Sequence, residues 1–446
     1  MSETSPAPKK VLVLNAIKPT PESARSERLE YAGLTKAAAT YAVDEGLRQE
    51  IFWNTTDDSL EERQAAQQLA MQYMLMGSAR LNNEAVRPES KQLWSDRYTQ
   101  ATSEIYGSPE TAIAKDILAR QVNDLAARAY QYGVDAPLLN HLLERAQYNG
   151  VELGEGEEVE APFLEQAEGF RDILQDRFER VFDALELDTA PKRIEMEDLA
   201  QRFEKALLVL ADQHDSAWAD WSVLRVEDKD QLSADGSKKI ISVGMKRASV
   251  SPEQAKGLFG HEVLVHAQRA VNGAKLSKEL GSGLSGYLDA EEGLGVFFEY
   301  AITGQVPDKV VDRYADIALA LGEIDGQPRT RSELLDFAMT RAYVRNEMED
   351  ADLRKSDEDI KKEVYAHINR IYRGSLGDEY VGVFTKDISY YAGFQQIGEY
   401  ISTQAEAGVS LDVIFDYLMS GKFDPTNEQH VARLAAARDQ ATSATE

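Results

Sequence analysis

The chain has 446 residues, 43% of them hydrophobic and 28% charged, which is typical of a soluble globular protein large enough for two or three domains. It contains no cysteine, so disulfides, thiolate chemistry and cysteine-based metal sites are excluded. A formal net charge of −28 disfavours nucleic-acid and anionic-membrane partners. With no bilayer-spanning apolar run and no secretory signal, we expect a cytoplasmic protein.

Residues 1–155 are predicted to form a mostly helical N-terminal region. Its expected elements are a short strand at Val11–Leu14, a helix at about 59–75, and a helix from Ser108, with Pro109 in its first turn, to Gly133. The Gly-rich, acidic stretch 150–160 is the best candidate for a domain boundary.

Residues 156–425 are predicted to form a catalytic domain, followed by a frayed tail at 426–446. Apolar residues with helical period run from Phe163 to Leu185 and from Met196 to Leu210. The pattern then predicts strands at Trp221–Val226 and Lys239–Met245, with a turn at Asp235-Gly236. Further helices are expected near 310–322, 330–346, 357–373, 386–405 and 410–420. The fold class is therefore mainly α with a small β-sheet (α+β).

A His-Glu-x-x-x-His motif directly follows the second strand. It consists of His261, Glu262 and His266, and its helix begins at the capping box Ser251–Gln254 and is expected to end at Asn272-Gly273. Two imidazoles and a carboxylate at this spacing are characteristic of a hydrolytic zinc site. The alternative is that each histidine is simply a satisfied core or surface group.

The spacing of the two histidines makes a specific structural prediction. Five residues advance about 500° along a regular α-helix, which would leave His261 and His266 roughly 140° apart. A π-bulge absorbs one extra residue and would return both to one face. A metal site here therefore predicts a π turn between Gly260 and Ala267, and a regular helix would argue against the metal.

A third ligand is expected from the acidic string Leu-Asp-Ala-Glu-Glu-Gly-Leu-Gly. Glu291 and Glu292 are the candidates, and the Gly-rich loop 281–286 allows the chain to turn back toward the histidines. Asp289 can cap this helix, and such an acidic cluster can also simply pair with the helix dipole. One zinc ion with three protein ligands keeps a position open for water, from which Glu262 can take a proton. Hydrolysis of an amide is the reaction that follows.

These strings also resemble a known family. HEVLVHAQRAVNG and YLDAEEGLG, with support from INRIYRG and VFTKDISYYAG, are similar to the microtubule-associated tyrosine carboxypeptidases and their bacterial relatives with a QEGLA motif. The resemblance covers about residues 163–417. It implies a mostly helical zinc metallopeptidase with a small sheet. Its zinc ligands would be His261, His266 and Glu292, with Glu262 as general base.

Glu292 is chosen over Glu291 because the family's ligating glutamate precedes the glycine of the motif. Two positions depart from the family pattern: Glu291 stands where the motif has Gln, and Gly295 where it has Ala. Neither change removes a ligand, but the additional acid can alter metal affinity or the charge of the pocket.

The activity implied by the resemblance is release of a C-terminal residue, which in animals is tyrosine from tubulin. Such an enzyme needs a cation for the terminal carboxylate. The candidates within the family-like strings are Arg269, Arg373 and Lys386. Tyr390 or Tyr391 could stabilise the oxyanion, and the strand at 239–245 could pair with the substrate backbone. Because tubulin tails are strongly acidic and this chain is acidic too, we predict a different peptide or protein substrate, whose C-terminal residue can still be aromatic.

The sequence thus predicts a cytoplasmic zinc metallopeptidase of carboxypeptidase type. Two alternatives stay open. One is a zinc-binding regulatory or interaction protein that keeps the fold without turnover, and the other is a zinc hydrolase of a small non-peptide amide. Glu262 favours an enzyme, because a protein that only binds would be free to lose its base.

Overall fold

The computed structural model describes residues 106–151, 163–351, 353–372 and 382–443, with scattered positions between 91 and 103. The predicted strand at Val11–Leu14 and the helix at 59–75 lie outside these residues, as does Arg373. The described chain is mainly helical with one small sheet, which confirms the predicted fold class. Within these ranges, no helix combines the length and the apolar character needed to cross a bilayer.

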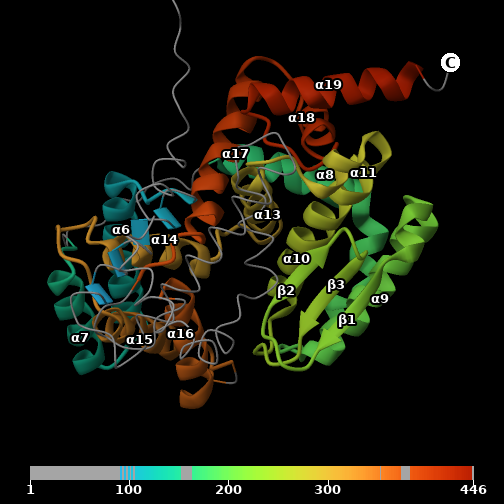
Figure 1. The fold of residues 1–446 in the computed structure, drawn as a ribbon. Helices are drawn as coiled ribbons and strands as arrows, with labels where there is room; N and C mark the ends of the chain where they lie inside the picture. The colour runs from blue at the N-terminus through green and yellow to red at the C-terminus, as the bar shows by residue number, and fades with distance from the viewer. Residues whose placement is uncertain are drawn as a thin grey trace, which may run out of the picture.

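One group of helices surrounds a first hydrophobic core (Figure 1). These elements are α8 (Leu164–Ala184), α9 (Met196–Gln213), α10 (Pro252–Phe259), η3 (Gly260–Ala267), α11 (Gln268–Leu276), α13 (Leu288–Thr303), α17 (Ile388–Glu406) and α18 (Leu411–Leu418). Phenylalanines dominate its centre. Phe170 of α8 meets Phe297 of α13 edge to face at 5.3 Å and Phe415 of α18 at 5.6 Å. Aromatic contacts of this kind stabilise beyond the apolar area they bury.

A second hydrophobic core joins segments from both halves of the chain. It is built by α6 (Thr111–Gln131), α7 (Ala136–Tyr148), α14 (Asp308–Leu321), α15 (Arg331–Met348) and α16 (Asp357–Ile371). Polar contacts support the packing: Gln121 of α6 donates to Asp312 of α14 at 2.8 Å. This core therefore contains helices from both sides of the predicted boundary near residue 155. The apolar stripes of α6 and α7 are covered by helices that follow the histidine motif.

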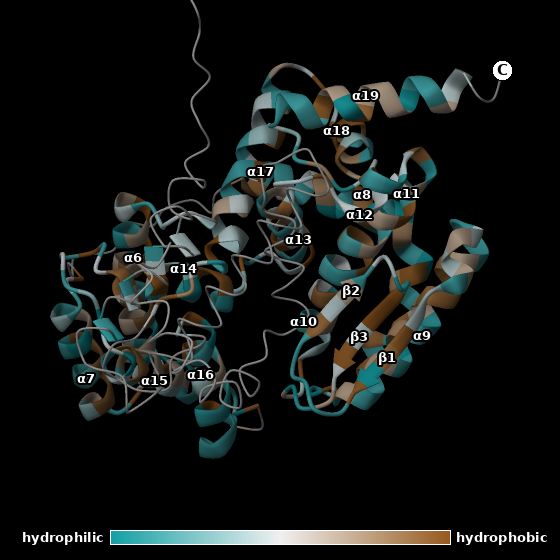
Figure 2. Cartoon of the chain, viewed as in Figure 1, coloured by the Kyte–Doolittle hydropathy of each residue, from teal (hydrophilic) through white to brown (hydrophobic). Residues whose placement is uncertain are grey.

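The sheet lies beside the first core and has the strand order β1-β3-β2. β1 (Ser222–Val226) runs parallel to β3 (Ile240–Gly244), and β2 (Leu232–Asp235) runs antiparallel to it. The apolar β3 stands out in Figure 2, with Ile241 and Val243 fully buried. Both predicted strands and the turn after Asp235 are confirmed. β2 was missed because four residues are too short for a clear alternation.

The place of β3 corrects one expectation. Both edges of β3 are paired with other strands, so the strand predicted at 239–245 has no free edge for a substrate backbone. The parallel pairing of β1 with β3 requires an intervening segment, and β2 is that segment.

Several predicted helix ends differ from those of the structure. α6 begins after Glu110 rather than after Ser108, and α13 begins after Tyr287 rather than after Asp289; neither preceding residue makes a capping hydrogen bond with its side chain. α11 continues through Gly273 to Leu276, because a glycine there lets the backbone of α12 (Lys278–Ser282) approach closely. The stretch 426–446 was expected to fray, but α19 (Glu428–Ser443) forms there and buries Leu434.

The backbones of α13 and α17 pack closely against each other next to the site. Gly293 of α13 and Gly393 of α17 face each other, and a Cβ on either would overlap the backbone of the opposite helix. The carbonyl of Asp289 occupies the space that a side chain at 393 would need. Only glycine on both helices permits this separation, which brings the start of α17 alongside α13.

We expect Gly393→Ala to destabilise the protein by about 1–3 kcal/mol or more, because backbone atoms cannot move aside as a flexible side chain can. Chemical unfolding followed by circular dichroism measures this change. Thr403→Ala, an exposed position on the same helix, is the control and should stay close to wild type. If the two variants had the same free energy of unfolding, α17 could move away from α13 without loss of stability.

Candidate metal centre

The histidine motif lies in a π-helical segment. η3 spans Gly260–Ala267, the interval in which the spacing predicted a π turn, and both histidine rings are buried. Hydrogen bonds of the i→i+5 type place residues five apart on the same face. The rings of His261 and His266 lie 4.7 Å apart with an interplanar angle of 79°. The predicted capping box of Ser251 and Gln254 begins the preceding helix.

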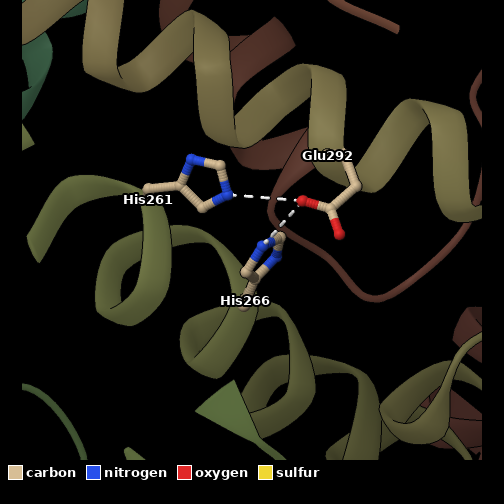
Figure 3. Close-up of side chains that lie close together, drawn as sticks. All are labelled: His261, His266 and Glu292. Carbon is tan, nitrogen blue, oxygen red and sulfur yellow. Dashed lines mark ion pairs between the residues drawn. The ribbon is translucent and has the colours of Figure 1, made fainter. Parts of the chain in front are cut away.

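Glu292 of α13 completes a cluster with the two histidines (Figure 3). Its Oε2 atom lies 3.4 Å from Nε2 of His261 and 3.5 Å from Nε2 of His266. Donor atoms held about 2.1 Å from a tetrahedral zinc ion would be separated from one another by about 3.4 Å. The donor types of the three side chains and the two separations from Glu292 therefore fit a zinc ion.

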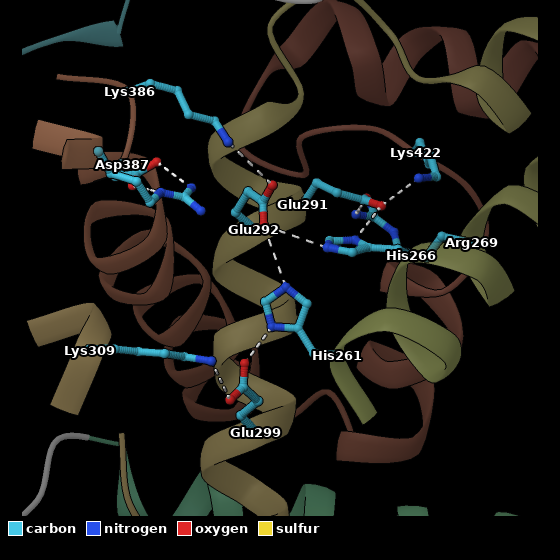
Figure 4. A network of polar contacts seen from close by, with 11 residues as sticks. His261, His266, Arg269, Glu291, Glu292, Glu299, Lys309, Lys386, Asp387 and Lys422 are labelled. Atoms are coloured by element: carbon cyan, nitrogen blue, oxygen red, sulfur yellow. Dashed lines mark hydrogen bonds and ion pairs between the residues drawn. The ribbon is translucent and has the colours of Figure 1, made fainter. Parts of the chain in front are cut away.

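Each histidine also contacts a second carboxylate through its other ring nitrogen (Figure 4). Nδ1 of His261 lies 2.7 Å from Glu299, and Nδ1 of His266 lies 3.0 Å from Glu291. A carboxylate accepting from Nδ1–H fixes the tautomer in which Nε2 carries a lone pair. Both imidazoles are thus oriented as metal ligands by side chains that do not themselves reach the centre of the cluster.

Gly295 leaves the room that His261 needs. A Cβ at this position would lie 2.7 Å from Nε2 of His261, which is closer than carbon and nitrogen atoms pack. The departure from the Ala of the family motif is therefore matched to the ring position in this chain.

The buried carboxylates are balanced by cations. Lys422 lies 2.9 Å from Glu291, which also pairs with Arg269, and Lys309 lies 3.7 Å from Glu299. Burial alone would raise the pKa of Glu299, but Lys309 and His261 outweigh it and lower that pKa to about 2. The same competition between burial and nearby cations holds the pKa of Glu291 far below its ordinary value.

The cluster strongly favours positive charge at its centre. Burial would lower the pKa of His261, but contacts with Glu292 and Glu299 override this effect and raise it to about 10. The pKa of Glu292 is held well below its usual range by the two histidines, against the effect of its own burial. A group of carboxylates arranged in this way stabilises a proton or a metal cation between them.

Arg269 was predicted as a candidate cation for the terminal carboxylate of a substrate, and its surroundings do not fit that role. It is 1% exposed, pairs with Glu291 and donates to the carbonyl of Phe423 at 2.8 Å. A guanidinium enclosed in this way cannot receive a substrate carboxylate, so Arg269 positions Glu291 and the segment after α18. Arg373, the second candidate, lies outside the described residues.

Lys386 and Tyr390 lie beside the cluster at the start of α17. Nζ of Lys386 is 3.9 Å from Oε1 of Glu292 and 5.2 Å from the centre of the Tyr390 ring. That ring lies 6.4 Å from the ring of His261. Burial, followed by the charge of Glu292, raises the pKa of Tyr390 to about 12, so its hydroxyl stays a hydrogen-bond donor.

Tyr391, the other candidate, faces the second core. Its ring lies 5.0 Å from that of Tyr314 and its hydroxyl accepts from Gln395. The structure therefore places Tyr390, and not Tyr391, against the histidines.

Glu262 is buried to 9% exposure on η3, between the two histidines in sequence. Its carboxylate makes no hydrogen bond or ion pair with any residue that the structure describes, and its oxygens are not fully enclosed. Its charge influences both His261 and Lys309. A carboxylate that is close to the cluster, without a fixed partner and open to water, is available to exchange a proton.

The residues that sequence reasoning missed are the supporting ones. Glu299 follows Glu292 by seven residues, which places both on one face of α13, so this spacing could have identified it. No sequence motif around Lys309 or Lys422 indicates that these residues belong to the site, because only tertiary packing brings each of them there.

The comparisons with known proteins gave one family. A family model described as microtubule-associated tyrosine carboxypeptidase matches residues 162–321 and 351–440, which include the whole cluster. No curated protein and no solved structure gave a significant match.

We expect Glu299→Gln to weaken zinc affinity by about 10- to 100-fold, because a neutral amide holds the Nδ1–H of His261 less firmly. Competition with a fluorescent zinc chelator measures the affinity. The exposed Glu279→Gln is the control for removing one negative charge. If both variants bind zinc as the wild type does, Glu299 has no part in orienting the ligand.

Proposed function

We propose, from the premise that the chain belongs to the microtubule-associated tyrosine carboxypeptidase family, that it is a zinc-dependent carboxypeptidase acting on a peptide or protein C-terminus. The observation that carries this proposal is the convergence of two Nε2 atoms and one carboxylate oxygen within 4.8 Å of one another, beside Glu262. The cytoplasm is the proposed location.

His261, His266 and Glu292 would hold the ion. Zinc bound there would polarise the scissile carbonyl and increase the acidity of water. The chain's own residues supply the remaining chemistry.

Glu262 acts as the general base in this proposal. Its carboxylate takes a proton from the water whose oxygen bonds to the carbonyl carbon, and then delivers that proton to the amine nitrogen as the C–N bond breaks. Tyr390 donates a hydrogen bond to the carbonyl oxygen as negative charge develops on it. Lys386 stabilises the charge of Glu292 and keeps that side chain in place.

The substrate is proposed to differ from an acidic tubulin tail. The family description names tyrosine and microtubules, but a net charge of −28 opposes the approach of a strongly acidic segment. A peptide of low charge with an aromatic C-terminal residue is the proposed substrate class.

Purified protein reconstituted with zinc is expected to hold about one ion per chain, because only one cluster among the described residues offers three converging ligands. Plasma emission spectrometry measures the zinc content. His266→Ala should lose most of the metal, whereas His141→Ala, on α7 in the second core, should keep it. Absence of zinc from the reconstituted wild type would remove the basis of the proposal.

Glu262→Gln is expected to retain zinc and to lose about 10²- to 10⁴-fold in kcat, since the amide cannot accept the proton. Digestion of a peptide library with mass-spectrometric detection measures the activity and the end from which residues are released. Glu253→Gln, on the exposed face of α10, is the matched control. Turnover by Glu262→Gln at the wild-type rate would contradict the role of the base.

The same digestion separates the alternative functions. Zinc binding with no turnover by the wild type would favour a protein that only binds. Cleavage of non-peptide amides alone would favour the small-amide hydrolase.

A further inference from the structure

Residues 382–389, which lead into α17, are all buried, and the first four have no regular secondary structure. They include Lys386, whose Nζ is 3.9 Å from Glu292 (Figure 4). They end one residue before Tyr390, whose ring lies 6.4 Å from that of His261. Irregular backbone stays inside a protein only where its polar groups find partners. The positions of Lys386 and Tyr390 therefore depend on the groups that bind this segment.

Two threonines from the N-terminal region bind the backbone of Val383. Its N–H donates to Oγ1 of Thr99 at 3.0 Å, and its carbonyl accepts from Oγ1 of Thr102 at 2.8 Å. The other contact of the Thr102 hydroxyl, with the carbonyl of Thr99, is longer at 3.0 Å. Both threonines have helical backbone, so a spacing of three places them on one face. Side chains 284 and 281 positions earlier in the chain thus satisfy both polar backbone groups of Val383.

Tyr106 and Gly107 extend this contact along the segment. The ring of Tyr106 meets that of Phe384 edge to face at 5.6 Å, and both rings are buried. A Cβ at Gly107 would lie 3.4 Å from Cδ1 of Ile388, so the two chains pass within van der Waals distance. These contacts lie on both sides of Lys386 in the sequence. We call Thr99, Thr102, Tyr106 and Gly107 the N-terminal clamp.

Helices of the second core hold the same segment at other points. The N–H of Phe384 donates to the carbonyl of the last residue of α16 at 2.8 Å. Asp387 accepts from Arg370 at 2.7 and 2.9 Å and lies 3.2 Å from Arg313. Among the described residues, however, only the two threonines bind the polar backbone groups of Val383. The contacts of the second core therefore do not replace those of the N-terminal clamp.

The N-terminal clamp lies outside the part of the chain that matches the family. The family model begins at residue 162, whereas the segment that the clamp holds lies within the matched range 351–440. The residues to which the proposed function assigns chemistry all belong to the matched ranges. Part of their support comes from residues that the family match does not cover.

We propose that the hydroxyls of Thr99 and Thr102 are positioning groups for the start of α17, and that the N-terminal region is thereby a required part of the site. By holding Val383, they keep Lys386 and Tyr390 beside the metal cluster. The inference rests on the proposed function, in which Tyr390 donates a hydrogen bond to the substrate carbonyl and Lys386 keeps the ligating carboxylate in place.

The reach of the chain explains how the effect is transmitted. Three residues separate Val383 from Lys386, a span of at most about 11 Å. Without the hydroxyls, the N–H and carbonyl of Val383 would be buried without partners, which is unfavourable. The segment would then move until these groups met water or another partner, and Lys386 would move with it.

The test removes each hydroxyl while it keeps the shape of the side chain. For cleavage of a labelled pentapeptide, Ala-Gly-Ser-Ala-Tyr with a free C-terminus, zinc-loaded full-length Thr102→Val and Thr99→Val are each expected to lose about 10- to 100-fold in kcat. KM and zinc content should stay close to wild type, because the metal ligands are unchanged. Thr102→Ser keeps the hydroxyl and should restore most of the lost activity. Thr403→Val, at an exposed position of α17, is the matched control and should behave as the wild type.

A second measurement does not need turnover. Replacement of Tyr390 by fluorotyrosine gives one fluorine NMR resonance, whose chemical shift reports the surroundings of that ring. Thr102→Val is expected to move or broaden this resonance, and Thr102→Ser should return it to the wild-type position. Thr403→Val should leave it unchanged. A variant that was merely less stable would show the wild-type resonance from its folded molecules.

The two measurements separate failure of this inference from failure of the proposed function. Cleavage by the wild type with an unchanged kcat in Thr102→Val overturns the inference and leaves the function standing. Absence of cleavage by the wild type, with a resonance that Thr102→Val moves and Thr102→Ser restores, overturns the function and supports the positioning role. Absence of cleavage with an unmoved resonance overturns both. If Thr102→Val does not fold, Thr99→Val is judged by the same criteria.

Discussion

The imidazole rings of His261 and His266 are each held between two carboxylates, and the rest of the site depends on this arrangement. One carboxylate, Glu292, is common to both rings, and the others, Glu299 and Glu291, fix the opposite nitrogens. A histidine held at Nδ1 cannot rotate or change tautomer without losing a buried hydrogen bond, which is unfavourable in an apolar interior. The geometry of the three clustered side chains is therefore set by the protein itself.

This arrangement requires features that no single residue provides. The π turn places both rings on one face, and Gly295 gives the ring of His261 its space. Three buried glutamates would repel one another strongly without compensation, so Lys422, Lys309 and Lys386 lie against Glu291, Glu299 and Glu292 respectively. The lysines come from three different parts of the chain, and the folded state is what assembles them.

The second core contributes to the site, although His261, His266 and Glu292 lie outside it. Lys309 and Arg313 belong to α14, and Arg313 joins Arg370 of α16 on Asp387, next to Lys386. Because α6 and α7 pack against these helices, the N-terminal helices support the cations that face the cluster. The glycine pair of α13 and α17 then fixes the start of α17 relative to Glu292. This explains how residues far from the motif in sequence can govern its geometry.

The amino-acid sequence was sufficient to predict features that depend on residues close together in the chain. The spacing of His261 and His266 implied the π turn, and the family-like string pointed to Glu292. Arg269 was misassigned because its side chain pairs with Glu291, 22 positions away, and with a carbonyl after α18. The continuation of α11 through Gly273 and the helix after residue 427 were missed, because they depend on packing against α12 and on the burial of Leu434. Sequence alone cannot show which of several cations will be enclosed and which will stay open.

The net charge of the chain bears on which peptides the proposed activity could accept. The net charge of −28 produces a repulsive field for anions, but salt screens that field beyond about 8 Å at physiological ionic strength. A neutral peptide, whose one negative charge is its terminal carboxylate, meets little of this repulsion. A long acidic tail presents many charges to the acidic surface at once and is repelled along its length. The net charge is therefore compatible with the proposed carboxypeptidase activity on peptides of low charge, and it opposes such activity on polyacidic chains.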